Sequence, residues 1–481
     1  MIYKNIRSLL VTILAVIFFS PVLSAQRMTL NDAVDIALKN NERIHQYEER
    51  FKQKKYENYE AWGNFLPSLT FNGSYNHMNT PLEMDLSPVR EAIIGTTLGG
   101  MQILGASAAT LTYANAAFQK GLPADEFVVQ LKKQDFKEGY FLGIQPIFLG
   151  GKLLAAKKYA SSELQSSEIE LKKIQNEVVQ ETITDYLSVV LLNDVIRTRE
   201  NVLTGMQKHQ SDAKRLLDAG LIAAHQELRA EVAVAEAERN LFDDQNKHTL
   251  ALIALKNALG LPELDPVEVS ESLTFINIPD SLNVFLSQAQ HSNPILQILA
   301  QKKDAAAQKF NAERAEFLPQ IAAFGKYEVF PQDLMVGLEP HWVVGINVSI
   351  NLFNGFKKYS RLESAMHLER EVEFTEADAS HKINLLVNKN YTDMTNSRNR
   401  FFKLKSNLSL AHENLRLMSN RFQTGLGTSL DVIDAQLILE KDEIESKMSL
   451  FDYYKSMTEL YTAVGSPQKV LEIWNSKGDL R

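Results

Sequence analysis

The sequence has no cysteine among its 481 residues. Disulfide bonds and thiolate metal sites are therefore excluded, and we expect no lipid anchor, which requires a cysteine after a cleavage site. Enzyme motifs are also missing, since there is no GxSxG, no phosphate-binding GxxxxGK and no HExxH. The ten histidines are scattered along the chain. We therefore expect no catalysis, no cofactor and no bound metal ion.

Strong net charge and long apolar runs are scarce as well. The net charge of −8 is mild for this length and argues against nucleic acid as a partner. One internal stretch, residues 92–119, carries no charge, and its Gly95 and Gly99 form a small-xxx-small pair that suits a transmembrane helix. Its many small and hydroxyl side chains, and its place between two expected strands, favour short helices instead.

The first residues have the layout of a secretory signal peptide. Lys4 and Arg7 give a charged start, an apolar run covers residues 9–19, and small residues around Ala25 offer a cleavage site. The apolar run is too short for a stable membrane span, although a short N-terminal anchor helix is the alternative. We expect export, with residues 1–25 removed.

The chain contains an internal duplication. The Phe-Leu-Pro element at residues 65–67 recurs at 317–319, which is 252 residues later, whereas Gly150 matches Gly355 at an offset of 205. Phe148 and Phe353 share the offset of 205, so the first copy holds a 47-residue insertion between Pro67 and Phe148. Fixed registers over such distances indicate two copies of one unit.

Each copy shows the same succession of patterns. A helical stretch, residues 30–66 in the first copy, leads to two stretches that alternate with period two and then to a proline-free helical stretch of about 67 residues, or roughly 100 Å. A glycine turn and a return helix of about 34 residues follow. The expected boundaries are a signal peptide at 1–25; a first repeat at 26–262 with strands about 68–78 and 137–148, an extracellular insertion about 80–135 and a helical hairpin about 151–259; an inter-repeat linker at 263–280; a second repeat at 281–467 with strands about 320–330 and 341–353 and a helical hairpin about 356–464; and a C-terminal tail at 468–481.

The strands predict an oligomer. Each chain supplies four strands with one apolar and one polar face, and an open four-stranded sheet would leave edge groups unpaired in hydrocarbon. Three chains would give a twelve-stranded barrel with a water-filled lumen. A soluble sandwich is the alternative, but it would not alternate with such long helices. The expected fold class is a mixed all-α coiled-coil barrel plus a transmembrane β-barrel, with two repeats of helix, β-hairpin and long helical hairpin per chain.

Over about residues 26–470 the sequence resembles the TolC family of outer-membrane efflux proteins, the outer membrane factors of tripartite pumps. The most specific match is the segment FQTGLGTSLDVIDA at residues 422–435. The resemblance implies a homotrimer in contact with outer-membrane lipid, a periplasmic adaptor (membrane fusion protein) and an inner-membrane transporter of RND, ABC or similar type. It places the chain in the outer membrane of a Gram-negative bacterium, extending into the periplasm.

The same resemblance implies a periplasmic gate. In the family, two aspartates three residues apart begin the last long helix, and Asp431 and Asp434 occupy those places. Repeated in three chains they would form acidic rings that attract cations. Acidic residues also suit any first helical turn because of the helix dipole, so that simpler explanation stays open. Where the best-known member uses Tyr and Arg as latch donors, this chain has Phe422 and Gly427.

The glycine turns are the second candidate site. The resemblance implies that these tips dock the adaptor, although glycine after a helix is often only a C-cap. The candidate docking residues are Gly220, Leu221, Gly425, Leu426 and Gly427. We therefore expect a passive exit duct of a tripartite efflux or type I secretion system. A periplasmic coiled-coil scaffold or adaptor without a pore is the alternative. Drugs, metal ions, peptides and proteins all remain candidates as cargo.

Overall fold

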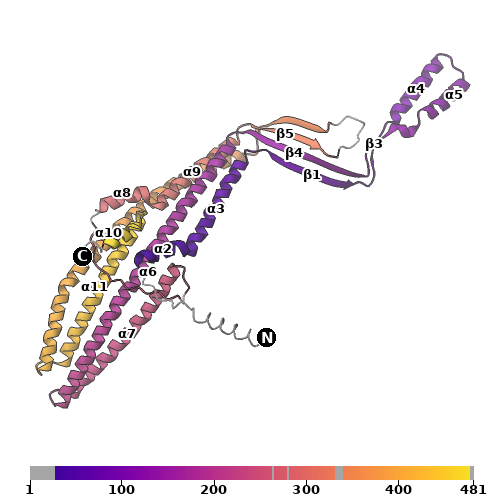
Figure 1. Ribbon diagram of the computed structural model, residues 1–481. Coiled ribbons are helices and arrows are strands. Elements are labelled where there is room, and N and C mark those ends of the chain that lie inside the picture. Colours follow the sequence, from indigo (N-terminus) through magenta and orange to yellow (C-terminus); the bar gives the residue numbers. More distant parts are fainter. Residues whose placement is uncertain (1–27, 263–264, 279–280, 331–339, 477–481) are drawn as a thin grey trace, which may run out of the picture. The chain divides into compact units, whose positions relative to one another are not determined.

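A computed structural model describes residues 28–262, 265–278, 281–330 and 340–476 (Figure 1). The signal peptide expected at 1–25, the ends of the inter-repeat linker and the last residues of the tail lie outside the described residues. In chain order the elements are α2 (Leu30–Asn40), α3 (Glu42–Gly63), β1 (Ser68–His77), β2 (Leu82–Asp85), α4 (Ser87–Ile103), α5 (Ala108–Gly121), the 3₁₀ helix η1 (Ala124–Phe127), β3 (Val128–Lys132), β4 (Asp135–Leu149), α6 (Lys152–Asp218), α7 (Ala224–Ala258), α8 (Leu282–Ser292), α9 (Pro294–Ala315), β5 (Gln320–Glu328), β6 (Trp342–Ser349), α10 (Lys357–Gln423), α11 (Ser429–Ala463) and α12 (Lys469–Asn475).

The chain divides into two compact units. Among the described residues, a helical unit draws on the stretches 28–56, 161–305 and 369–476, and a strand unit draws on the stretches 57–160 and 306–368. Each unit therefore draws on both sequence repeats.

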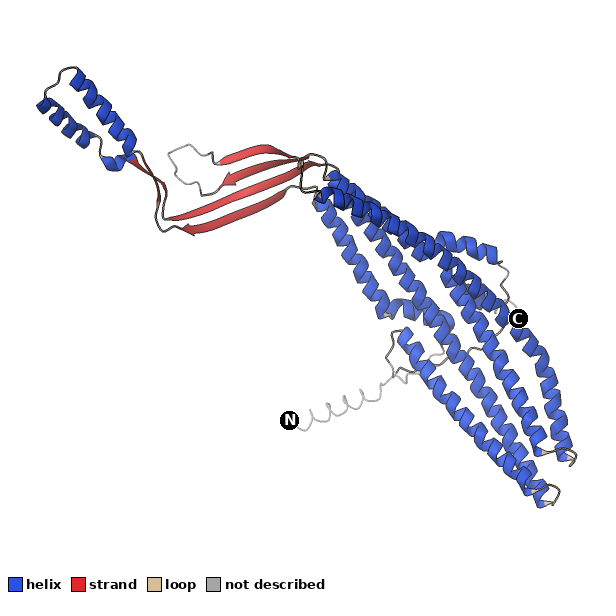
Figure 2. Cartoon of the chain, turned by 180° about the vertical axis from the view of Figure 1, so that it is seen from behind, coloured by secondary structure: helices blue, strands red, loops and turns tan. Residues whose placement is uncertain are grey.

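The strand unit holds a four-stranded antiparallel sheet in the order β1-β4-β5-β6, drawn in red in Figure 2. One rung of this sheet aligns four aromatic residues, Phe71, Phe141, Tyr327 and Trp342. On this face Leu69, Gly143, Gly325 and Val344 form the adjoining rung, whereas the other face carries many Ser, Thr, Asn and charged residues. Within the described residues, β1 and β6 have a partner on one side only.

The insertion of the first repeat forms its own small substructure. β2 and β3 pair as a two-stranded sheet, and between them lie α4 and α5, 17 and 14 residues long. Arg90 on α4 is buried and donates from Nε to the Leu122 carbonyl at 2.7 Å, which ties the two helices together. Among the described residues, no helix combines the length and the hydropathy needed to cross a membrane.

In the helical unit the short helices pack along the long ones. Arg43 of α3 forms ion pairs with Glu177 and Glu181 of α6, both at 3.0 Å, and further along α6 Arg199 pairs with Asp244 of α7 at 2.8 Å. The second repeat uses α9, α10 and α11 in the same way. A large apolar core joins the repeats, and its bulkiest buried members include Tyr186, Leu187, Phe285, Tyr453, Tyr454 and Met457.

The expectation of one continuous helix over residues 30–66 is wrong, because the chain breaks at Asn41 between α2 and α3. The Asn41 amide donates to the Ala258 carbonyl at 2.9 Å, and its oxygen accepts from the Arg43 backbone N–H at 3.0 Å. Asn293 repeats this arrangement with the Ala463 carbonyl and the Ile295 N–H, at 2.7 and 2.8 Å. Asn41 thus caps the start of α3 and satisfies a carbonyl at the end of α7, and Asn293 does the same for α9 and α11.

Glycine makes these junctions possible. Gly260 and Gly465 follow α7 and α11 with φ of 66° and 81°. A Cβ would lie 2.5 Å from the Asn40 carbonyl oxygen at the first position and 2.4 Å from that of Ser292 at the second. Only glycine combines this left-handed conformation with so close an approach. The helix pairs α7–α3 and α11–α9 therefore meet end to end beside α6 and α10.

Candidate functional site: the tips of the helical hairpins

Both helical hairpins turn through the same backbone motif. α6 ends at Asp218, and Gly220 and Leu221 donate to the carbonyls of Leu217 and Leu216, each at 2.8 Å. At the end of α10, Gly425 and Leu426 bond to Phe422 and Arg421 in the same pattern, at 3.0 and 2.8 Å. These are Schellman turns, in which a left-handed glycine closes the last helical turn. The glycines have φ of 70° and 77°.

The residue after each glycine turns its side chain outward. Leu221 is 66% exposed and Leu426 is 74% exposed, although both are aliphatic. Gly427 packs its backbone against Arg421, where an added Cβ would lie 3.2 Å from the Arg421 Cβ. The expected docking residues therefore form two small surface turns, each with one leucine available for contact.

The predicted gate residues lie in the first turns of α11. Thr428 caps the helix, and Asp431 completes a capping box by accepting from the Thr428 backbone N–H at 2.8 Å and from its hydroxyl at 2.9 Å. These bonds, led by the one from the backbone, hold the pKa of Asp431 below its usual range. Asp434 is exposed and has no polar partner among the described residues. Asp431 thus has a structural task that Asp434 lacks.

The two hairpins touch each other near their tips. The Ser429 backbone N–H donates to the Gln226 side-chain oxygen at 3.1 Å, and the Ser429 hydroxyl lies 2.7 Å from His209 Nε2. Ser429 is fully buried and His209 nearly so. Burial lowers the pKa of His209, and the nearby Asp212 carboxylate opposes that effect only in part.

Phe422 lies in the same contact. It is buried with Ala213, Ala230 and Val432, and its ring centroid is 4.6 Å from that of His209. One residue on, Gln423 donates to the Asp212 carboxylate at 3.0 Å. Phe422 therefore fills an apolar contact that is surrounded by hydrogen bonds between other residues.

These contact residues were missed by the sequence analysis. Gln423 and Ser429 lie in the segment 422–435, but their partners His209, Asp212 and Gln226 belong to no motif. The two groups meet only because the repeats pack side by side. The internal offset gives no hint either, because it aligns a residue with its copy and not with its contact partner.

The hairpins are also joined away from the tips. Arg199 of α6 lies between Asp244 of α7 and Glu440 of α11, and both carboxylates are almost fully buried. Further along, the Lys447 ammonium donates to the Asp194 carbonyl at 2.7 Å and to the Thr198 hydroxyl at 2.5 Å. α11 is thus bonded to α6 at several levels.

No group of His, Asp or Glu side chains in the described part of the chain is arranged to hold a metal ion. The residues expected to act as a gate carry charge and no catalytic geometry.

Comparison with known proteins identifies the family. Residues 33–261 and 285–466 match the family described as outer membrane efflux protein. The outer membrane protein TolC of Vibrio cholerae is 24% identical over 206 residues, which is 42% of this chain and 47% of that protein. The aligned segment thus spans about half of that relative's length.

Solved structures share the fold. The outer membrane protein VceC of Vibrio cholerae has a TM-score of 0.72 at 18% identity, over 91% of this chain and 96% of VceC. The CmeC outer membrane channel of Campylobacter jejuni has a TM-score of 0.71 at 14% identity, over 92% and 88% of the two chains. At these identities the likeness is one of fold.

The expected family, location and lack of enzymatic activity are confirmed by these matches, since most of the chain matches the outer membrane efflux protein family and the relatives are outer membrane proteins. The protein is an outer-membrane protein that extends into the periplasm. Two family segments together cover most of the sequence, so the chain belongs to the outer membrane efflux protein family.

Proposed function

We propose that three copies of this chain form one passive exit duct, with a twelve-stranded barrel in the outer membrane and a helical tunnel below it. A periplasmic adaptor would connect the duct to an inner-membrane transporter that supplies the energy. The observation that carries the proposal is the open sheet, whose edges β1 and β6 each lack one partner among the described residues.

Strand direction supports closure by further copies. Four antiparallel strands place β1 and β6 in opposite directions, so β6 of one copy can pair with β1 of the next without breaking the antiparallel order. Closure of this kind satisfies every edge group in hydrocarbon, which an isolated sheet cannot do.

The exposed face of the sheet supports a lipid contact. Val344, Ile346 and Val348 of β6 are each 64–68% exposed, and Leu69 and Phe71 of β1 on the same face are 73% and 55% exposed. A soluble protein would bury such a face. Strands of about ten residues also match the length that a tilted transmembrane strand requires.

The absence of cysteine makes a direct test available. In one copy β1 and β6 are separated by two strands, or roughly 14 Å at about 4.8 Å per strand, which is too far for a disulfide. Cysteine pairs that combine Ser68, Thr70 or Asn72 with Val343, Gly345 or Asn347 are introduced and oxidised in outer-membrane fractions. We expect covalent dimers and trimers for pairs in register, while each single cysteine variant yields no trimer.

Monomers for every pair, or protein found only in the soluble periplasmic fraction, would contradict the duct. The second outcome would favour the alternative, a periplasmic scaffold or adaptor without a pore.

The tip of the second hairpin is the proposed gate. Asp431 and Asp434 from three copies would form two acidic rings at the periplasmic end of the duct. The contact of His209 and Gln226 with Ser429, and of Asp212 with Gln423, would hold that hairpin against the first one at rest. Gly220, Leu221, Gly425, Leu426 and Gly427 form the proposed adaptor-docking turns.

Asp434→Asn is the sharper test of the gate, because Asp434 takes no part in the capping box. We expect lower cation selectivity in planar-bilayer recordings, since an acidic ring attracts cations. Glu227→Gln removes the same charge from the first turn of α7 and serves as control. Equal selectivity in wild type and Asp434→Asn would remove the gate assignment and leave the duct itself untouched.

A further inference from the structure

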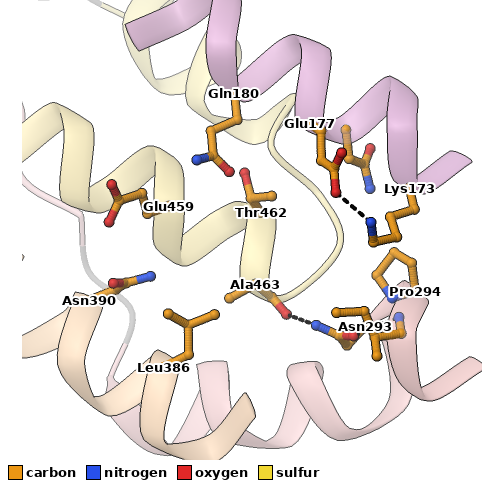
Figure 3. Close-up of a pocket in the computed structure, with 12 residues that line it drawn as sticks. Lys173, Glu177, Gln180, Asn293, Pro294, Leu386, Asn390, Glu459, Thr462 and Ala463 are labelled. Atoms are coloured by element: carbon orange, nitrogen blue, oxygen red, sulfur yellow. Dashed lines mark hydrogen bonds and ion pairs between the residues drawn. The ribbon is translucent and has the colours of Figure 1, made fainter. Parts of the chain in front are cut away.

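A cleft of about 230 Å³ lies within the helical unit, well away from the hairpin tips. It is lined by α6 on one side, by α9 and α10 on another and by the end of α11 (Figure 3). Its volume corresponds to roughly seven or eight water molecules at about 30 Å³ each. The cleft is therefore large enough for a small organic molecule.

One buried side chain in this cleft lacks every expected hydrogen bond. Asn390 is 1% exposed, and neither its Nδ2 nor its Oδ1 has a partner in the described part of the chain. Figure 3 shows its amide reaching into the space between the helices. Burying an unpaired amide costs on the order of 2 kcal/mol or more, so buried amides are nearly always bonded to protein, water or ligand.

Two further polar groups border the cleft without a partner among the described residues. The Gln180 amide of α6 points into the same space, and the Glu459 carboxylate of α11 lies on the side of Asn390. Both side chains are half-buried. Together with Asn390 they bring unpaired hydrogen-bonding groups from three helices to one cavity.

The charge balance of the cleft is negative. Lys173 and Glu177 also line it, and Glu177 forms ion pairs with Lys173 at 2.5 Å and with Arg43 of α3 at 3.0 Å. Glu459 is the one charged lining residue that has no ion pair among the described residues. The rest of the lining is apolar, with Pro294, Ile295, Leu386 and Ala463 contributed by α9, α10 and α11.

The polar set is particular to this place and does not follow from the duplication. At the offset of 205 residues, Asp185 and Ala254 stand where the second repeat has Asn390 and Glu459. The first repeat therefore has a carboxylate where Asn390 supplies an amide, and a methyl group where Glu459 supplies a carboxylate.

We propose that this cleft binds a small organic ammonium ion with a hydroxyl or amide group and a short branched apolar tail. The ammonium meets Glu459, the amides of Asn390 and Gln180 bond the neutral polar group, and the tail packs on Leu386 and Ile295. Because the ligand touches α6, α10 and α11, it links the two hairpins and stabilises their association. The site does not depend on the proposed duct.

L-Leucinol is a suitable probe, since it carries a protonated amine, a hydroxyl and an isobutyl tail. Calorimetric titration of the detergent-solubilised full-length protein is expected to show saturable binding with a Kd on the order of 1 mM, in keeping with so small a ligand. The matched compound 4-methyl-1-pentanol lacks the amine and is expected to bind at least about tenfold more weakly.

Variants assign the site. Glu459→Gln is expected to weaken leucinol binding about tenfold or more, and Asn390→Leu to abolish it while the thermal midpoint is kept or raised, because an unpaired buried amide is removed. Asn388→Leu on the exposed side of α10 and Glu445→Gln, four turns before Glu459 on α11, serve as controls and should bind as wild type does.

The proposal would be overturned if leucinol gave no saturable heat, or if leucinol and 4-methyl-1-pentanol bound with equal affinity. The cleft would then hold only water. Unchanged affinity of Glu459→Gln would overturn the proposal as well. Since Glu459 is half-buried and its replacement is isosteric, that variant decides the matter even if Asn390→Leu does not fold.

Discussion

Two left-handed glycines in the second repeat separate the effect of backbone conformation from the effect of crowding. Gly425 and Gly465 have φ of 77° and 81°, where alanine costs about 1–2 kcal/mol. At Gly425 an added Cβ would have nothing within 4 Å. At Gly465 it would lie 2.4 Å from the Ser292 carbonyl oxygen and 3.3 Å from Pro294 Cδ, so the backbone must shift. Crowding of a packed site adds about 1–3 kcal/mol.

We therefore expect Gly425→Ala to lower the free energy of unfolding by about 1–2 kcal/mol and Gly465→Ala by about 2–5 kcal/mol. Guanidinium unfolding of the detergent-solubilised protein, followed by circular dichroism, measures both midpoints. The first repeat offers a replicate, because a Cβ added at Gly220 would meet open space and one added at Gly260 would lie 2.5 Å from the Asn40 carbonyl oxygen. Equal unfolding midpoints for Gly425→Ala and Gly465→Ala, or for the Gly220 and Gly260 variants, would refute the role assigned to the helix junctions.

Three further predictions concern buried charge and pH. Arg199→Met leaves Glu440 buried without its cation and should cost about 3–5 kcal/mol in unfolding experiments, whereas Arg416→Met, which breaks only an exposed pair with Glu413, should change little. Burial, assisted by the charge of Glu181, raises the pKa of Asp185 to about 6, so the contribution of Asp185 to the free energy of unfolding falls as pH rises from about 4 to 6. Asp185→Asn should flatten the plot of unfolding free energy against pH in that range. An unchanged slope of that plot would contradict this. Burial lowers the pKa of His209, so the folded state resists protonation of this ring and the protein loses stability as pH falls below about 6.5. His209→Gln should reduce this fall of the thermal midpoint at acid pH. A fall equal to that of the wild type would rule out His209 as its source.

Regular elements could be predicted from the sequence because their signals are local. The long helices are free of proline and end beside Gly220 and Gly425, so their extent follows from composition and from the conformation that glycine permits. Strands such as β6 alternate apolar and polar residues with period two. The duplication then supplied the order of the elements twice over.

Side-chain geometry between the repeats could not be predicted. Asn41 sits in a helical pattern, and the carbonyl that breaks the helix belongs to Ala258, 217 residues away. Asp431 and Asp434 look equivalent in the sequence, yet only Asp431 is engaged by Thr428. Asn390 gives no signal at all, since its lack of partners depends on how α6, α10 and α11 pack around it.

The end-to-end helix pairs have a mechanical consequence. α6 and α10 transmit axial tension through one continuous peptide backbone. In the end-to-end pairs α7–α3 and α11–α9, by contrast, the two helix ends are joined by the side-chain hydrogen bonds of Asn41 and Asn293. A force along such a pair loads a hydrogen bond and the packing around a glycine. Under an axial pull, each of these two junctions is therefore the first point to separate, while the long helix beside it keeps the two shorter helices aligned so that they can re-form the contact.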